Sequence, residues 1–423
     1  MGIFLWHGLG PGTDTFKQIV HEWNAQHPEQ ENQVILKQPY SDYGQAAKDA
    51  LAVPDDAPSS EQPNLVLAPE YMTSTMKEKK ILPISQFLDQ KQLEAVADIV
   101  RKTFGDQNGN LASLPFNPAC GMLFYNKEVV ERSLLKMGFT ADHIPESMEE
   151  LDNLCRSQGL QWGAAWHAAY LCEMVAAQQD IALVEPDNGR LGYGKFQLSQ
   201  GWFYDHILDL RAQKRDGVLF YFPKDPYSVE PRKAFLEGRI AFFMQGLGHL
   251  APLTSDAKNP EKSPLPFTVS CAPLPILLKG HTSKYTLPLG GASIWVLDNA
   301  RTKAMVSQVK DFLAYLASEP VQEKWHKETG YVPALKSIPE KLKTDGFYDV
   351  NPLHKAVVAQ TIEAPVGNHS FGIHIPGYDK SRPAIFDLLD EVLDLNKSDE
   401  DVNALLVEFD EKYSVPKKEV SSS

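Results

Sequence analysis

The chain has 423 residues, 43% of them hydrophobic, and a formal net charge of −14. This length exceeds one ordinary hydrophobic core, so two domains are expected, and the composition is that of a folded globular protein. The acidic balance argues against a nucleic-acid-binding surface and against an anionic-membrane-bound patch, because both need basic excess. It does not exclude a small anionic ligand, since one local cation outweighs the global sign at short range.

The first third of the chain alternates short apolar runs with helix-period segments. Strands are predicted at Ile3–His7, Gln33–Lys37 and Asn64–Ala68, and helices at Thr15–His27 and up to Val53. This order predicts a doubly wound α/β fold. Ligand sites are expected outside the carboxyl ends of such strands, which is where Tyr43 and Glu70 fall.

Further along, Ile81–Leu88 is predicted to be a short turn plus a helix, and the prolines within Leu114–Pro118 predict a bend. The remaining elements predicted are a strand at Gly121–Tyr125, a helix from Lys127, a capping box at Ser147–Glu150, a helix end plus buried strand at Phe235–Met244, and helices from Lys336 onward. The tail Val415–Ser423 is polar and is expected to be disordered.

The cysteines are too few and too widely spaced for a metal site or a disulfide framework. Cys120, Cys155, Cys172 and Cys271 form no Cys-x-x-Cys pair. They are expected to be buried free thiols, with a Cys155–Cys172 disulfide left open. No metal and no cofactor are predicted.

The amino terminus carries no basic region followed by a long apolar core, so no secretion signal is predicted in this sequence. Met1-Gly2 leads directly into an apolar strand. This start is typical of a chain whose leader was replaced by a start codon, and a cytosolic protein would look the same. No run reaches the roughly twenty apolar residues of a transmembrane helix.

The stretch from Leu287 to Ala334 carries the most distinctive pattern. Gly290-Gly291 precedes the strand-like Ser-Ile-Trp-Val-Leu, and glycine lets backbone approach another molecule closely. A helix-period segment follows, and then Thr-Gly-Tyr331-Val-Pro presents a tyrosine beside a proline-fixed backbone. Gly-Gly before a strand is also common in ordinary turns.

With these motifs the chain resembles the solute-binding proteins of ABC importers, in particular the subfamily for sn-glycerol-3-phosphate and glycerophosphodiesters. The resemblance covers nearly the whole length and rests on Leu5-Trp-His7, Pro115-Phe-Asn117, Tyr125-Asn-Lys127, Phe235-Leu-Glu-Gly-Arg239, Gly290-Gly-Ala-Ser-Ile-Trp295, Trp325-His to Tyr331-Val-Pro333, and Gly346-Phe-Tyr-Asp-Val-Asn-Pro352.

The resemblance implies a two-lobed α/β periplasmic-binding-protein fold of type II-like topology that closes on a ligand in the interlobe cleft. The lobes are expected at 1–117 with 270–327 and at 118–269 with 328–423. It further implies a monomeric, periplasmic, non-enzymatic receptor, without its leader in this sequence, that delivers its ligand to the permease subunits of an ABC transporter.

The resemblance also assigns ligand contacts, one position at a time. Glu70 would bind glycerol hydroxyls, Trp166 would pack on the glycerol moiety, and Arg382 would pair with phosphate, since a planar guanidinium grips phosphate oxygens bidentately. The full set of expected ligand-binding residues is Tyr43, Glu70, Trp166, Gly246, Gly291, Tyr331 and Arg382. Without the resemblance, each of these residues also fits an ordinary core or surface role.

The chain departs from the family pattern at several phosphate-contacting positions. Pro118-Ala119-Cys120 and Gln245 to His249 replace serine-containing stretches, and His374 stands where the family has an arginine. Backbone N–H groups of Gly246 to Gly248 could form an anion nest instead, and His249 or His374 could add a pH-dependent charge.

Three ligand classes therefore stay open. The ligand is a phosphate monoester, or a phosphodiester that needs fewer donors and whose choline-like cation Trp166 and Tyr170 could cover, or a sugar or oligosaccharide bound by a receptor of the same fold. An enzyme is not favoured, because the sequence has no nucleophile elbow, no phosphate-binding Lys-Ser/Thr loop and no metal-ligand spacing.

Overall fold

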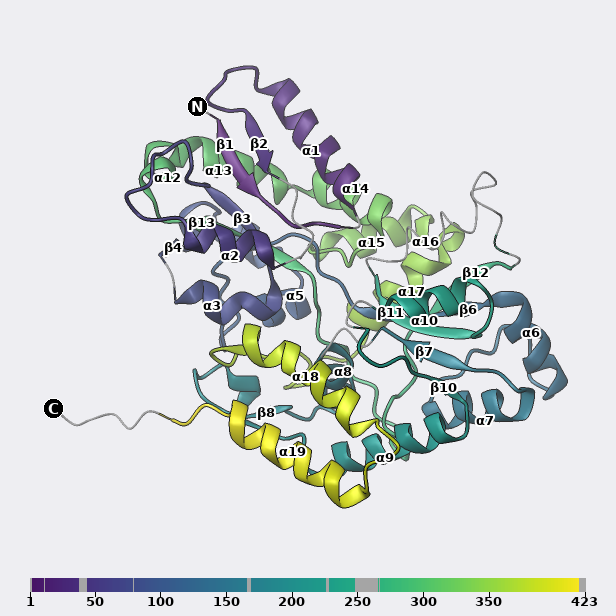
Figure 1. Ribbon diagram of the computed structural model, residues 1–423. Coiled ribbons are helices and arrows are strands. Elements are labelled where there is room, and N and C mark those ends of the chain that lie inside the picture. Colours follow the sequence, from purple (N-terminus) through teal and green to yellow (C-terminus); the bar gives the residue numbers. More distant parts are fainter. Residues whose placement is uncertain are drawn as a thin grey trace. The chain divides into compact units, whose positions relative to one another are not determined.

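The structure, a computed structural model, describes residues 2–10, 12–37, 44–78, 80–165, 169–225, 228–247, 265 and 267–417. The chain divides into two compact units (Figure 1): unit 1 comprises Met1–Cys120 and Leu289–Val358, and unit 2 comprises Gly121–Pro288 and Ala359–Ser423. Each unit is built from two separate stretches of chain, so the chain passes between the units three times.

The chain crosses between the units at residues other than those that the sequence analysis predicted. Residues 270–288, expected in the first lobe, belong to unit 2, because Ser270, Cys271 and Ala272 hydrogen-bond as a strand to Tyr125, Phe124 and Leu123. Residues 328–358, expected in the second lobe, belong to unit 1, where the backbone N–H of Val332 donates to the carbonyl of Pro118 at 2.9 Å.

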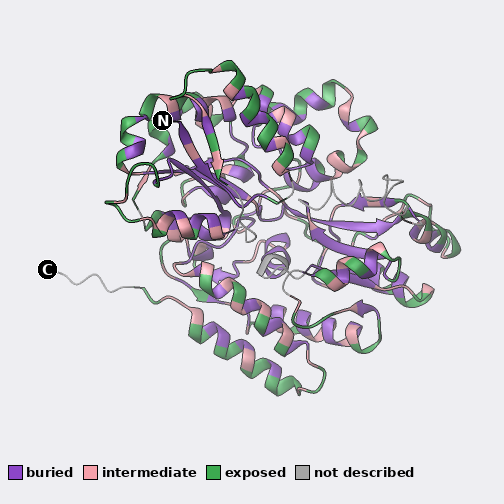
Figure 2. Cartoon of the chain, turned by 45° about the horizontal axis from the view of Figure 1, so that its top comes forward, coloured by how far each residue is buried: buried purple, intermediate pink, exposed green. Residues whose placement is uncertain are grey.

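Unit 1 is organised around a mixed sheet in the order β2-β1-β3-β13-β4, with β5 also paired to β13. Its strands are β1 (Ile3–Trp6), β2 (Val34–Lys37), β3 (Leu65–Pro69), β4 (Ile81–Leu82), β5 (Leu114–Pro115) and β13 (Ala292–Leu297). The first three strands pair in parallel, as a doubly wound fold requires, and β13 joins them antiparallel. β13 is buried along its whole length (Figure 2).

Helices cover this sheet and form its core. Ala46, Ala47 and Ala50 of one helix pack with Trp6 and Trp295 of the strands, since small side chains let a helix lie close to a sheet. The helical segments of unit 1 are α1 (Thr13–Gln26), α2 (Gln45–Ala52), η1 (Glu70–Met72), α3 (Thr73–Lys77), η2 (Ile84–Gln86), α4 (Gln90–Glu94), α5 (Asp98–Phe104), α12 (Ala300–Ala304), α13 (Val306–Leu316), α14 (Glu319–Thr329), α15 (Ser337–Thr344) and α16 (Phe347–Val350), while α17 (Pro352–Thr361) spans the last crossing.

The segment Ile81–Leu88 differs from its prediction. Ile81 and Leu82 form β4, an edge strand paired with β13, and only the short η2 turn follows. A two-residue strand leaves no periodicity in the sequence, and the pairing that creates it comes from residues more than two hundred positions away.

Unit 2 contains a second mixed sheet in the order β10-β7-β11-β6-β12. Its strands are β6 (Gly121–Asn126), β7 (Trp162–Ala164), β10 (Leu219–Phe220), β11 (Phe242–Gly246) and β12 (Val269–Ala272), with β8 (Val184–Glu185) and β9 (Lys195–Phe196) as a separate hairpin. β6 lies antiparallel between β11 and β12 and is fully buried.

The helical segments of unit 2 are α6 (Lys127–Lys136), α7 (Met148–Gln158), α8 (Ala169–Gln178), η3 (Asp187–Gly189), α9 (Gly201–Arg215), α10 (Val229–Leu236), α18 (Tyr378–Val392) and α19 (Asp399–Tyr413). The Ser147 hydroxyl accepts from the N–H of Glu150 at 3.2 Å and so caps α7. The Glu150 carboxylate accepts from Glu146 rather than from Ser147, so the expected reciprocal box is displaced by one residue.

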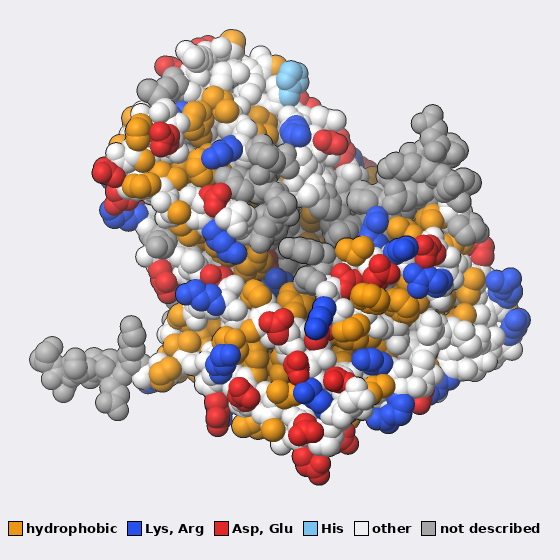
Figure 3. All heavy atoms as spheres, in the orientation of Figure 1, with side chains coloured by type: hydrophobic (Ala, Val, Ile, Leu, Met, Phe, Trp, Pro, Cys, Tyr) orange, Lys and Arg blue, Asp and Glu red, His pale blue; other side chains and the backbone are white. Residues whose placement is uncertain are grey.

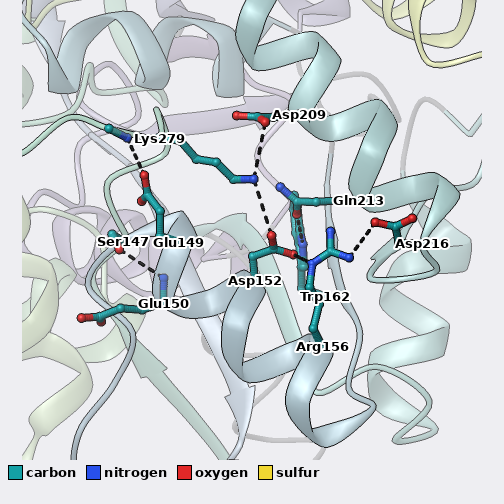
Figure 4. A network of polar contacts seen from close by, with 11 residues as sticks. Ser147, Glu149, Glu150, Asp152, Arg156, Trp162, Asp209, Gln213, Asp216 and Lys279 are labelled. Carbon is teal, nitrogen blue, oxygen red and sulfur yellow. Dashed lines mark hydrogen bonds and ion pairs between the residues drawn. The ribbon is translucent and has the colours of Figure 1, made fainter.

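Ion pairs tie α7 to its neighbours (Figure 4). Asp152 of α7 accepts from Arg156 at 2.8 Å and lies 3.5 Å from the ammonium of Lys279, which is also 3.5 Å from Asp209 of α9. Arg156 reaches Asp216 at 2.6 Å. The network links α7 to α9. Each of these partly exposed ion pairs contributes little to stability by itself.

Other expectations are met or corrected within the described residues. All four cysteines are buried free thiols, so the disulfide left open is not formed. Val415, placed in a disordered tail, exchanges two backbone hydrogen bonds with Gly194. Among the described residues no helix is long and apolar enough to cross a membrane. On the face shown in Figure 3, acidic and basic side chains are interspersed.

Candidate ligand-binding site

Unit 1 brings Glu70 and Gly291 together at the end of its sheet. β3 and β13 pair so that Pro69 lies opposite Ala292, and the N–H of Glu70 donates to the carbonyl of Gly291 at 3.1 Å. Glu70 directly follows β3 and is 8% exposed. The sequence analysis expected Glu70 at this strand end and Gly291 ahead of a later strand, and the two are neighbours in the structure.

Gly291 is required by its backbone and by its surroundings. Its φ of +95° is unfavourable for L side chains, and a Cβ atom would lie 2.0 Å from the carbonyl oxygen of Asn117. Gly290 and Ala119 exchange backbone hydrogen bonds of 2.7 and 3.0 Å beside this contact. The close backbone approach that the Gly-Gly pair indicated is thus an approach to the chain's own Asn117–Ala119 segment.

Tyr331 follows the end of α14 and contacts the same segment. Gly330 ends that helix with φ of +77°, and Tyr331 stacks on Trp325 with ring centroids 5.5 Å apart and planes 4° from parallel. Its hydroxyl is hydrogen-bonded to the Asn117 side chain. Burial raises the pKa of Tyr331 to about 12, against the opposing effect of that hydrogen bond, so the hydroxyl is neutral.

A buried histidine holds the Tyr331 turn in place. His326 Nδ1 lies 2.5 Å from the Tyr331 carbonyl oxygen, and Nε2 lies 3.1 Å from the Tyr348 hydroxyl. Because the carbonyl can only accept, Nδ1 carries the proton and Tyr348 donates to Nε2. Burial lowers the pKa of His326 to about 4. The Trp-His and Phe-Tyr motifs, separate in sequence, are therefore parts of one network.

We call Glu70, Asn117, Gly291 and Tyr331 the unit 1 cluster. Sequence reasoning named three of its members, and Asn117 only as part of a motif. A hollow of about 330 Å³ in the same unit is lined by other residues, among them Asp55, Gln62 and Lys80, and includes no member of the cluster.

Unit 2 places Arg382 beside a carboxylate that the sequence analysis did not name. Arg382 lies one turn after Tyr378 on α18, and its charge acts on Glu173 of α8. The Tyr378 hydroxyl donates to Glu173 Oε1, and both residues are buried. We call Glu173, Tyr378 and Arg382 the unit 2 cluster. Burial raises the pKa of Glu173 to about 7, although the Arg382 charge and the Tyr378 hydrogen bond both oppose this rise.

A second arginine stands next to His374, the position where the family pattern has an arginine. Arg190 donates to His374 Nδ1 at 3.0 Å and to the Gly372 carbonyl at 3.0 Å, and its guanidinium lies 4.3 Å from the Phe371 ring centroid. Since a guanidinium only donates, His374 Nδ1 is the acceptor and is unprotonated. A guanidinium from a distant part of the sequence thus lies beside His374.

Gly246 ends β11 opposite Gly121. Its N–H donates to the side-chain oxygen of Gln245 at 2.6 Å, so this amide already has an acceptor. Gln245 Nε2 is buried and has no hydrogen-bond partner within the described residues. This buried amide can donate a hydrogen bond at the strand end, as the hydroxyl of the missing serine would have done. Tyr43, Trp166, Gly248 and His249 lie outside the described residues.

The sequence pattern around Glu173 could have marked it as a candidate, although the sequence analysis did not name it. Glu173 is the one charged residue in the otherwise apolar run of α8, and glutamate is rarely buried unless it is paired. Gln245 left none, because only the packing around β11 shows that its amide is buried.

Two α/β units, each assembled from two stretches of chain, define the class of two-lobed solute-binding proteins. The model of the bacterial extracellular solute-binding protein family matches residues 18–355, and this chain belongs to that family.

Relatives and solved structures agree on this class. The sn-glycerol-3-phosphate-binding periplasmic protein UgpB of Agrobacterium fabrum is 24% identical over 68% of this chain, a match that spans 62% of that relative. The crystal structure of UgpB from Mycobacterium tuberculosis in complex with glycerophosphocholine aligns over 97% of both chains, with a TM-score of 0.70 and 17% identity. The cyclic alpha-maltosyl-1,6-maltose binding protein of Arthrobacter globiformis aligns over 96% of this chain and 97% of its own, with a TM-score of 0.71 and 16% identity.

Proposed function

We propose that this protein is an extracytoplasmic, periplasmic receptor that captures sn-glycerol-3-phosphate or a glycerophosphodiester by closure of its lobes and delivers it to the permease of an ABC importer. It carries out no chemistry on the ligand and acts as a monomer. The observation that carries the proposal is the unit 1 cluster: Gly291 and Tyr331, far apart in sequence, both contact Asn117, and Glu70 is hydrogen-bonded to Gly291.

The chemistry of both clusters supports this ligand class. The Glu70 carboxylate suits two adjacent glycerol hydroxyls, because each of its oxygens accepts hydrogen bonds. The Arg382 guanidinium suits phosphate oxygens, and Gly246, Gly291 and Tyr331 are proposed as further contacts. Tyr43 and Trp166 complete the proposed set. The names of the UgpB relatives support the same class.

An oligosaccharide receptor is the second candidate. The solved structure with the same fold from Arthrobacter globiformis is a maltose-type binding protein, so the fold alone does not choose the ligand. An arginine beside the buried Glu173–Tyr378 pair favours a phosphate over an uncharged sugar.

Isothermal titration of the purified protein with sn-glycerol-3-phosphate, glycerophosphocholine and maltotriose tests the proposal. Binding of at least one glycerophosphate compound and no binding of maltotriose is expected. Binding of maltotriose alone would reject the glycerophosphate class. Recovery of an altered ligand after incubation, measured by phosphorus NMR, would reject the role as a receptor without catalysis.

A further inference from the structure

Glu173 is a carboxylate that unit 2 keeps in its interior. It lies on α8 between the buried residues Cys172 and Met174. The Tyr378 hydroxyl donates to its Oε1, and a Cβ atom at Gly372 would lie 3.7 Å from its Oε2. The carboxylate is thus buried on α8, accepts a hydrogen bond from Tyr378, and lies beside the backbone of Gly372.

The position of α8 relates Glu173 to the strand ends of its own unit. Met174, the next residue along the helix, lies against Gly121, where a Cβ atom would come 2.5 Å from the Met174 Cε. Gly121 pairs with Gly246, the glycine proposed to contact the ligand. Glu173 is therefore adjacent on α8 to a residue that lies against the Gly121–Gly246 end of the unit 2 sheet, and its carboxylate also interacts with the charge of Arg382.

Among the described residues, the charges around Glu173 are mixed and do not form a strongly cationic phosphate site. Arg382 faces Glu173, and the second guanidinium, of Arg190, is held by His374, by the Gly372 carbonyl and by the Phe371 ring. A carboxylate near a guanidinium cancels much of the field that an approaching anion meets. A phosphate monoester carries about −1.5 to −2 charges at pH 7, whereas a phosphodiester carries one.

We propose that Glu173 is a specificity-determining residue, which offsets the charge of Arg382 so that the protein favours the singly charged phosphate of a glycerophosphodiester over the doubly charged phosphate of a monoester. This inference rests on the proposed function, and it assigns the preference within the glycerophosphate class to one carboxylate. Repulsion by Glu173 grows in proportion to the ligand's charge, so the monoester is penalised about twice as strongly as the diester.

A purely structural role does not require a carboxylate here. Glutamine has nearly the same shape and could also accept from Tyr378, without the cost of burying a charge. Burial raises the pKa of Glu173 to about 7, so ionising this side chain in its buried position costs free energy. Perturbed carboxyl groups of this kind gather at functional sites.

The test is titration calorimetry at pH 8, where the Glu173 carboxyl is mainly ionised, with three ligands. They are sn-glycerol-3-phosphate as a dianion, glycerophosphoglycerol as a monoanion without a cation, and glycerophosphocholine as a monoanion with one. The wild-type protein is expected to bind both diesters more tightly than the monoester. Glu173→Gln is expected to raise monoester affinity about tenfold or more, and diester affinity by about threefold.

The matched control is Glu237→Gln, which removes the same charge from an exposed ion pair with Arg239 in the same unit, 2.8 Å long, and should leave all three affinities unchanged. Equal changes for the three ligands in Glu173→Gln would overturn the inference. So would a loss confined to glycerophosphocholine, since Glu173 would then contact the cation instead. A wild-type preference for the monoester overturns it even if the variant fails to fold. Absence of binding by all three ligands would instead reject the proposed function itself.

Discussion

The unit 1 cluster and the unit 2 cluster differ in what holds them together. In unit 1 the positions are set by backbone, since Gly291 lies against the Asn117 carbonyl and the Tyr331 turn is bonded to His326. In unit 2 they are set by charge, because Arg382 acts on a buried carboxylate that also binds Tyr378. The comparison indicates that backbone contacts hold one cluster and charge interactions the other, so the two clusters should fail separately when mutated.

The largest expected effect is on the folding of unit 1. Gly291→Ala puts a Cβ atom 2.0 Å from the Asn117 carbonyl oxygen at a φ of +95°, so the backbone must shift. The unfolding free energy should fall by about 3 kcal/mol or more. Urea unfolding followed by circular dichroism measures it. Gly10→Ala is the control, because a Cβ there meets nothing within 4 Å, and equal stability of the two variants would contradict this account.

The next effect is on ligand affinity and concerns unit 2. Arg382→Ala should weaken binding of a glycerophosphate ligand by about 2 kcal/mol or more, as expected for a lost charge-assisted pair. Arg382→Lys should recover part of the loss, since an ammonium keeps the charge but not the bidentate geometry. Calorimetric titration measures both variants. Arg239→Ala, which disrupts an exposed pair in the same unit, is the control, and unchanged affinity in Arg382→Ala would reject its role.

Acid should act against the neutral histidines of unit 1. Burial lowers the pKa values of His7 and His326 to about 4, with Lys17 adding to the effect at His7. Their folded pKa values lie below the unfolded value of about 6.5, so their contribution to stability is present above pH 6.5 and is lost as the pH falls towards 4. The expected loss is on the order of 3 kcal/mol per histidine.

Urea unfolding of the wild type and of His326→Gln at several pH values tests this expectation. Glutamine can replace the two hydrogen bonds without titrating, so the variant should lose less stability between pH 6.5 and 4. Identical pH slopes for both proteins would show that His326 is not held neutral by its surroundings. His206 of unit 2, whose pKa burial also lowers to about 4, contributes the same background to both.

The last effect tests the comparison with the opposite sign. Burial raises the folded pKa of Glu173 to about 7, above its unfolded value, so this group favours folding at low pH and the advantage is lost as the pH rises from 4.5 through 7. Glu173→Gln should therefore raise the unfolding free energy at pH 8 by about 3 kcal/mol, and at pH 5 by about 1 kcal/mol or less. A loss of stability at pH 8 would mean that pairing with Arg382 outweighs the cost of burial.

The sequence predicted the sheets and their turns well where the pattern was local. The strand end before Glu70 and the turn at Gly330 follow from residues within a few positions. The strand predicted to end at Met244 extends to Gly246, and the need for glycine at 291 depends on the distant Asn117 carbonyl. The boundaries of the two units do not follow from nearby residues either, because 270–288 is assigned by a strand pairing with β6 and 328–358 by packing in unit 1. Such assignments depend on contacts between distant segments, which no local sequence pattern reveals.

The sequence alone predicted the class of the protein, through the resemblance of its motifs to a known family, and the same resemblance singled out Glu70, Gly291 and Tyr331. Glycine and proline constraints are visible in the sequence because they act on the residues that carry them. The tertiary structure alone decided which charges meet. It placed Arg382 where its charge acts on Glu173, put Arg190 beside His374, and buried the Gln245 amide. The physical reason is that electrostatic partners are chosen by distance in space, and these partners are separated in sequence by up to about two hundred residues.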